Sequence, residues 1–163
     1  MSQDLDITMK SQESPKNYKY MKAALKEARK AELENEVPVG AVVVYQDKII
    51  ARAYNKREQM QSFHAHAEFL AMMKAAKKIG SWRLEDCDVY VTMEPCQMCA
   101  GAMIQSRIKN LYYGTKDPKA GAVGSVLNLL ETPFNHHIHV VSGLMAEESQ
   151  DLLKSFFKKL REK

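Results

Sequence analysis

Residues 88–114, DVYVTMEPCQMCAGAMIQSRIKNLYYG, carry the pattern that decides the fold. Residues 88–92 form a short apolar run typical of a buried strand, residues 96–106 have helical spacing, and residues 108–114 are again strand-like. Alternation of strands and helices is typical of parallel sheets, because the helix carries the chain back across one face of the sheet. This stretch therefore predicts an α/β protein with parallel strands.

The flanking segments extend the pattern in both directions. Upstream, apolar positions recur at helical spacing over residues 17–34, two β-rich runs flank a turn at residues 46–48, and a helix is expected over residues 65–79. Downstream, we expect a short strand over residues 138–141 and a last amphipathic helix from residue 146. The predicted fold is therefore α/β in three layers, α/β/α, with a five-stranded mixed sheet that is mostly parallel and includes one antiparallel hairpin.

Composition limits the class of protein. A chain of 163 residues, 45% hydrophobic and 27% charged, suits one globular domain. Its start, MSQDLDITMK, lacks the apolar core of a signal peptide, and no apolar run is long enough for a membrane span, so we expect a cytoplasmic protein with no membrane partner. Residues 1–16 are polar and without periodicity, which predicts a disordered tail before a domain at residues 17–163. The net charge of +4 permits a phosphate-bearing partner without requiring one.

Two of the three cysteines form a candidate metal half-site. Cys96 and Cys99 are three residues apart, with Pro95 where a helix would begin. Positions i and i+3 of a helix face the same way, and the N-terminus of a helix favours thiolates. The two cysteines could also be ordinary buried thiols, so the interpretation depends on a second half-site.

The stretch HAHAEFLAMM, beginning at His64, offers that second half-site. His66 and Glu68 would point to opposite sides of a helix interior, so they can converge only if the helix begins here and an ion lies over its N-terminal end. His66, Cys96 and Cys99 would then give zinc three protein ligands and an open fourth position, as in catalytic sites. Glu68 beside a water on the ion would be able to take and return a proton.

Other potential ligands are expected to lie outside this site. His64 is interpreted as a loop or substrate-side histidine, and Cys87 as a packed thiol at the edge of a strand. If either closed the coordination sphere, the protein would be a non-enzymatic zinc module, but such a module has no need of Glu68. Three more histidines lie on or near the predicted strand at residues 138–141: His136, His137 and His139. They could mimic a metal site, but histidines on a short surface strand are common without a metal.

Together, these motifs resemble the bacterial tRNA-specific adenosine deaminase family, which belongs to the cytidine/deoxycytidylate deaminase-like zinc deaminases. HAE followed about 30 residues later by PCxxC is the zinc-deaminase signature. The resemblance extends over VPVGAVVV, HAHAE, EPCQMCAGA, FNH and SFF, and covers residues 17–163. Gln97 and His64 depart from the residues that the family often has at these positions.

The resemblance implies a reaction and a set of site residues. It implies hydrolytic deamination of adenosine to inosine at the wobble position of a tRNA anticodon, with zinc-activated water, one zinc per chain and Glu68 as proton shuttle. It also implies that Asn55 hydrogen-bonds the base, that Val37 and Pro38 line the pocket, and that Asn135 lies near the anticodon backbone. The alternative is a guanine or cytidine deaminase acting on a free base or nucleoside, which would share the zinc site and lack an RNA surface.

The expected partners are the anticodon stem-loop and a second copy of the chain. The resemblance implies a homodimer, for which Met98 and Met103 would offer an adaptable apolar face. Phe156 and Phe157 could stack on a base or pack in the core. The basic residues of the last helix could touch RNA phosphates or form a solvated face, and they are Lys154, Lys158, Lys159, Arg161 and Lys163.

Overall fold

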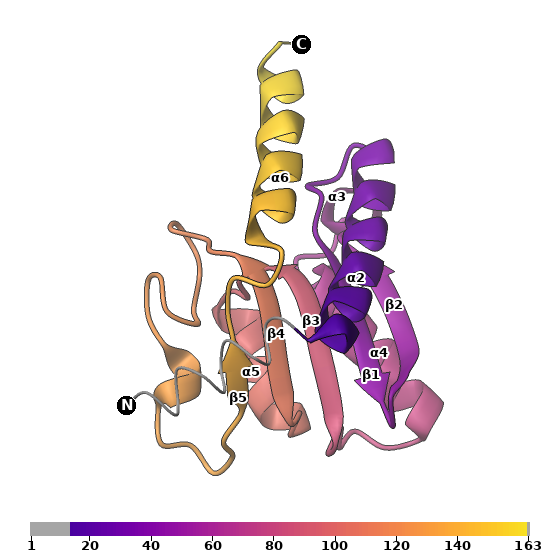
Figure 1. Cartoon of the computed structure of the whole chain (residues 1–163), viewed down its shortest axis with the longest axis vertical. Helices are drawn as coiled ribbons and strands as arrows, with labels where there is room; N and C mark the ends of the chain where they lie inside the picture. The colour runs from indigo at the N-terminus through magenta and orange to yellow at the C-terminus, as the bar shows by residue number, and fades with distance from the viewer. Residues whose placement is uncertain (1–13, 163) are drawn as a thin grey trace.

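A five-stranded sheet in the order β2-β1-β3-β4-β5 forms the middle layer of the computed structural model, which describes residues 14–162 (Figure 1). The strands are β1 (Gly40–Tyr45), β2 (Lys48–Tyr54), β3 (Cys87–Met93), β4 (Asn110–Thr115) and β5 (His139–Val141). β1 pairs antiparallel with both β2 and β3, whereas β3 with β4 and β4 with β5 pair in parallel. The sheet is therefore mixed, as predicted, and β1 is the one described strand that runs in the opposite direction.

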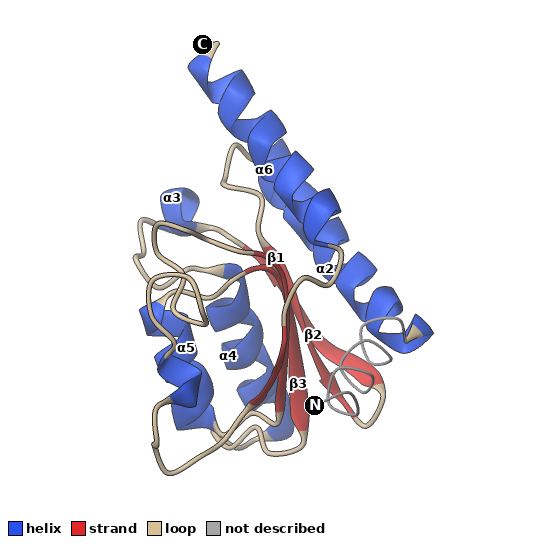
Figure 2. Ribbon diagram, turned by 60° about the vertical axis from the view of Figure 1, so that its left-hand side comes forward, coloured by secondary structure: helices blue, strands red, loops and turns tan. Residues whose placement is uncertain are grey.

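Helices cover both faces of the sheet, which confirms the predicted three layers. Figure 2 shows α4 and α5 on one face and α2 and α6 on the other. The helical elements are α2 (Pro15–Leu33), α3 (Arg57–Met60), α4 (Ala67–Ile79), α5 (Gln97–Ser106), α6 (Ala146–Arg161) and the 3₁₀ turn η1 (Leu129–Glu131). None of the described helices combines the length and apolar character needed to cross a membrane.

The two faces of β1 explain why its sequence is almost continuously apolar. Val42 and Val44 pack with residues of α2, whereas Val43 belongs to the larger core beneath α4 and α5. Successive strand residues point to opposite faces, so a strand covered on both sides has no polar position. The strand begins at Gly40, where a Cβ would lie 2.1 Å from the carbonyl oxygen of Ala24 on α2, so this helix rests directly on the sheet.

The element boundaries differ from the predictions in small ways. α2 begins at Pro15, two residues before the predicted start, because the fixed φ of proline suits the first position of a helix. The rest of the predicted tail, residues 1–13, and Lys163 lie outside the described residues. α3 and η1 were not predicted, because elements of four and three residues are too short to show a helical period.

Candidate metal and catalytic site

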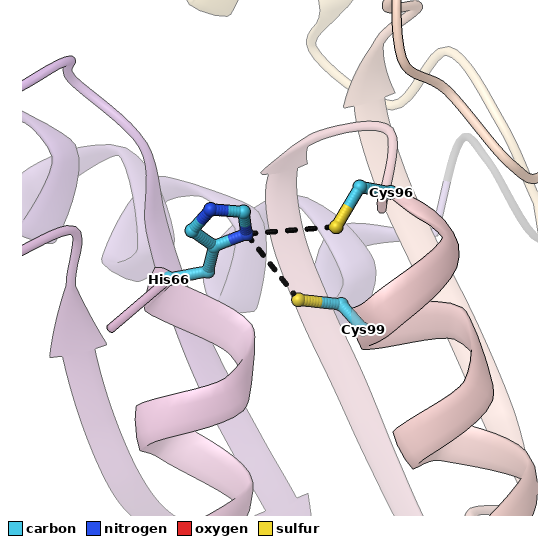
Figure 3. Close-up of side chains that lie close together, drawn as sticks. All are labelled: His66, Cys96 and Cys99. Carbon is cyan, nitrogen blue, oxygen red and sulfur yellow. Dashed lines mark hydrogen bonds between the residues drawn. The ribbon is translucent and has the colours of Figure 1, made fainter. Parts of the chain in front are cut away.

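Two helix starts face each other at the candidate site. His66 is the N-cap residue of α4 and Cys96 that of α5, and both have extended backbone conformations. Their carbonyl oxygens accept the first helical hydrogen bonds, from Leu70 at 3.0 Å and from Ala100 at 2.9 Å. Figure 3 shows His66 at the start of α4 turned towards Cys96 and Cys99 at the start of α5. The predicted condition for convergence, a helix that begins at His66, is therefore met.

The distances within the ligand triad (His66, Cys96 and Cys99) match a tetrahedral ion. The Nδ1 atom of His66 lies 3.6 Å from Sγ of Cys96 and 3.5 Å from Sγ of Cys99. Tetrahedral zinc, with bonds of about 2.0–2.1 Å to nitrogen and about 2.3 Å to sulfur, separates these atoms by about 3.6 Å. Among residues 14–162, the triad is the one group of three or more such side chains close enough to share an ion. The residues present therefore fit zinc.

Hydrogen bonds between the three side chains prepare a thiolate. A hydrogen bond from Cys99 is the main cause that lowers the pKa of the Cys96 thiol to about 3, and His66 contributes another. The hydrogen bond to Cys96 and burial raise the pKa of Cys99. The pKa of His66 is raised, chiefly by its hydrogen bond to Cys96. Cys96 thus offers an anionic sulfur to a divalent cation, whereas binding at Cys99 has to displace the proton of its thiol.

Glu68 is a buried acid beside the triad. It lies in the first turn of α4 and is 4% exposed. Burial raises its pKa to about 7, against the opposing effect of His66. A carboxyl group with a pKa near neutrality can both accept and donate a proton at physiological pH, which suits general acid–base catalysis.

A cavity of about 470 Å³ opens on this centre. It lies at the carboxyl ends of the parallel strands β3 and β4, the usual ligand position in open α/β sheets. One side, the α3 wall, consists of Val37, Val39, Asn55 and Arg57. The opposite side, the loop wall, consists of residues 117–120. Leu153 and Phe157 of α6 complete the lining near the loop wall.

The predicted base-binding residues are only partly at the cavity. Asn55 lines it; its Nδ2 donates to the carbonyl oxygen of Val37 at 3.2 Å, and its Oδ1 accepts the backbone N–H of Arg57 at 3.1 Å. Val37 also lines the cavity. Pro38 does not, and Val39 does instead: the N–H of Val39 donates to the carbonyl oxygen of Val37 at 2.8 Å, and this tight turn leaves Pro38 buried and outside the lining.

The remaining candidates lie elsewhere. Asn135 is exposed and outside the cavity lining. His64 makes edge contacts with the rings of Phe63 and Phe69, and Cys87 is fully buried in the core. Of the two adjacent phenylalanines, Phe156 is buried, in agreement with a core role, while Phe157 is 40% exposed and lines the cavity.

Two buried carboxylates that were not predicted from the sequence support the walls, and one of them, Glu94, also belongs to the cavity lining. Glu36 is 1% exposed and accepts the backbone N–H groups of Glu58 and Gln59 in α3, at 3.0 and 2.9 Å. Glu94 is 3% exposed and accepts hydrogen bonds from the chain that follows the loop wall. The signal in the sequence is slight, because glutamate is usually a surface residue and nothing local marks these two as buried.

Comparisons with known proteins agree with this geometry. Residues 16–161 match the MafB19-like deaminase family. The chain is 52% identical over 145 residues to the tRNA-specific adenosine deaminase of Bacillus subtilis, which covers 88% of this chain and 90% of the relative. It is 44% identical over 143 residues to the protein of the same name from Agrobacterium fabrum, covering 87% and 94%.

Solved structures of tRNA and guanine deaminases are both similar to this chain. The guanine deaminase of Nitrosomonas europaea has a TM-score of 0.72 and 25% identity, and covers 88% of this chain and 84% of that one. A structure from studies of A-to-I editing by tRNA:A34 deaminases at the wobble position of transfer RNA has a TM-score of 0.79 and 44% identity, and covers 82% of this chain and 98% of that one. The guanine deaminase of Bacillus subtilis is more distant, with a TM-score of 0.58 and 27% identity over 72% of this chain and 85% of the other.

Proposed function

The chain belongs to the tRNA-specific adenosine deaminase family, and on this premise we infer that it converts adenosine to inosine at the wobble position of a tRNA anticodon. The observation that carries the reaction class is the buried Glu68 beside the ligand triad in one cavity. The choice of substrate rests on relatedness, since identity is 52% to a tRNA enzyme and 27% to a guanine deaminase.

We propose that the triad holds one zinc ion per chain. The donor set and the nitrogen-to-sulfur distances of 3.6 and 3.5 Å support this assignment. When bound, zinc supplies a Lewis acid that makes water acidic enough to react at neutral pH. Three protein ligands leave a position open towards the cavity, which His66 and Cys96 both line.

Glu68 is proposed to carry the protons of the reaction. A water oxygen adds to C6 of adenine, the C6–N bond breaks, and ammonia leaves. Glu68 accepts one proton from the water and delivers it to N1 of the base. It then accepts the proton of the new hydroxyl group on C6 and passes it to the departing amino group, which leaves as ammonia. The burial that raises its pKa to about 7 lets one carboxyl group perform both transfers.

The cavity walls are proposed to hold the flipped base. Asn55 is 8% exposed, and its amide retains one hydrogen and one lone pair beyond the bonds to Val37 and Arg57. That spare capacity suits recognition of a purine edge. Phe157, 40% exposed at the cavity rim, supplies an aromatic face for stacking. The role of Asn135 near the anticodon backbone stays a prediction.

A basic groove next to the cavity supports an RNA partner. It shares Lys119, Leu153 and Phe157 with the cavity lining. Its other basic residues are Lys116, Lys154, Lys158 and Arg161. Cations in this position can neutralise the phosphates on either side of a flipped nucleotide. A tRNA substrate also favours the cytoplasm as the place of action.

A homodimer is proposed on the outer surface of α4 and α5. A groove there is lined by Phe69, Trp82, Met98 and Ala102, and Trp82 is 59% exposed. Met98 therefore contributes to an apolar face as predicted, whereas Met103 is fully buried in the monomer core and does not. Sedimentation at micromolar concentration tests the proposal, and a single species of 18.5 kDa would contradict it.

The substrate is tested with a short panel of RNAs and small molecules. The zinc-loaded protein is given an anticodon stem-loop with adenosine at the wobble position, the same loop with guanosine there, and free adenosine, cytidine and guanine. We expect inosine from the first substrate and little product from the others, because free nucleosides lack the contacts that position the base. Efficient turnover of guanine with an untouched stem-loop would overturn the proposed function.

A further inference from the structure

Glu94 holds the chain that forms the loop wall through four hydrogen bonds. Its Oε1 accepts the backbone N–H of Asp117 at 3.1 Å and the hydroxyl of Ser125. Its Oε2 accepts the backbone N–H groups of Val123 at 3.0 Å and Ser125 at 3.1 Å. All four donors belong to residues 117–125, so one carboxylate fixes both ends of this segment.

Only a carboxylate satisfies these donors. An ionised carboxyl group offers about four lone-pair sites and carries no hydrogen, which equals the number of donors that converge on Glu94. A glutamine amide has an NH₂ group in place of one oxygen. In either orientation this group would face at least one backbone N–H, from Asp117 or from Val123 and Ser125, and leave it without an acceptor.

Gly121 shows how tightly the segment is seated. A Cβ at this position would lie 2.2 Å from Oε2 of Glu94 and 2.6 Å from the carbonyl oxygen of Asp117. Any side chain would therefore push the segment away from the carboxylate. The contact and the hydrogen bonds are independent observations, and both place the backbone of residues 117–125 directly on Glu94.

The C-terminal half of this segment is also held by the core, in which Ala122 and Val123 are buried. The N–H of Ala122 donates to the carbonyl oxygen of Pro95 at 2.8 Å, and the hydroxyl of Tyr113 donates to that of Val123 at 3.1 Å. Within the segment, Oδ1 of Asp117 accepts the N–H of Lys119 and shapes the turn. The wall residues 118–120 are exposed, and Asp117 at their start is tied to Glu94, so we expect the position of the wall to be sensitive to this carboxylate.

We propose that Glu94 is a positioning residue, which sets the loop wall where the flipped nucleotide and its neighbours bind. This inference rests on the proposed function. Glu94 itself belongs to the cavity lining, but its carboxylate oxygens are engaged by the four donors of the segment. It therefore acts through residues 117–120, which line the cavity and of which Lys119 also lines the basic groove, and not on the reacting atoms. Its loss should therefore weaken RNA binding more than it slows the chemical step.

The test uses Glu94→Gln and Gly121→Ala, which disturb the same contact from its two sides. Hydrogen exchange in the zinc-loaded full chain should become about tenfold faster or more at residues 117–125, while β3 stays protected. KM for the adenosine-wobble stem-loop should rise about tenfold, with kcat changed less than about threefold and zinc content unchanged. Gly121→Ala decides the question if Glu94→Gln fails to fold.

Val42→Ala is the matched control, because Val42 is fully buried beneath α2 and touches neither the cavity nor the loop. It should lower the melting temperature without faster local exchange or a higher KM. Unchanged exchange at residues 117–125 in both variants would overturn the proposal, as would faster exchange with unchanged KM, or loss of zinc in step with the rise in KM. An inactive wild-type protein would instead refute the proposed function, since the exchange experiment needs no turnover.

Discussion

The reaction centre (the ligand triad with Glu68) and the cavity walls are built in different ways. In the reaction centre the functional groups are side chains, held at the starts of α4 and α5. The two walls are backbone segments, each held by one buried carboxylate that binds N–H groups. Substitution of wall side chains should therefore leave the position of a wall intact, whereas the roles proposed for the triad and Glu68 depend on their side chains. The difference teaches that the reaction and the placement of the substrate can be tested separately.

Loss of a triad residue should give the largest effect. In Cys96→Ala the ion loses a thiolate, so we expect zinc below stoichiometric occupancy and inosine formation at assay background. Metal analysis and the stem-loop assay measure the two effects. Cys87→Ala is the control, because Cys87 lies in the core and should leave zinc content unchanged. Full zinc occupancy in Cys96→Ala would show that the ligand set is wrong.

Substitution of Glu68, the proposed proton shuttle, should have the second largest effect on activity. Glu68→Ala should fold, retain zinc and lose at least about 10²–10⁴-fold in kcat, which is typical for general acid–base catalysis. Measurement of kcat and zinc content in the same preparation separates this effect from that of Cys96→Ala. Turnover within a few-fold of the wild type would remove Glu68 from the mechanism.

Disturbance of the α3 wall should have a smaller effect, seen in KM rather than in kcat. Glu36→Gln disturbs two backbone hydrogen bonds, whereas Glu94 accepts four, so we expect a rise in KM of about tenfold or less and normal zinc content. The expected order in KM is wild type, Glu36→Gln, then Glu94→Gln. A fall in kcat at constant KM would mean that this wall belongs to the reaction centre.

The smallest effect concerns a group outside both regions. Burial raises the pKa of Cys87 to about 11 from 9.0. The unfolded chain therefore loses this proton at lower pH than the folded one, and the thiol's contribution to stability falls as the pH rises from about 9 to about 11. Melting temperatures of wild type and Cys87→Ala, compared across this range, should converge towards high pH, with no change in kcat at pH 7. A constant difference would show that Cys87 ionises equally in both states.

The reaction centre and the layers were predictable because their signals are local. HAE and PCxxC lie at helix starts, and the apolar runs of β1 and β3 announce strands buried on both faces. The identity of the wall residues was less accessible. The resemblance implied that Val37 and Pro38 line the pocket, but the tight turn at residues 37–39 places Val37 and Val39 there. Which residues of a turn face a cavity depends on how the chain leaves α2 and enters β1, and no local pattern shows this.

The carboxylates that support the walls were not predictable at all. Glu36 and Glu94 become buried acceptors only when segments 22 to 31 residues away fold against them. Met103 was also predicted wrongly: its apolar side chain was assigned to a dimer interface, and it lies in the core of the monomer. Local pattern indicates that a residue is apolar or charged, but only the tertiary fold decides what it faces.

The two helix starts of the ligand triad also bear on how the chain folds. His66 and Cys96 are 30 residues apart, and α4 and β3 lie between them. An ion shared by these residues binds only where the two half-sites meet, so its binding free energy adds to the stability of the folded chain. Because the half-sites meet only after β3 has joined the sheet, such an ion stabilises the assembled core and not its parts. An ion proposed for catalysis would then also stabilise the folded chain.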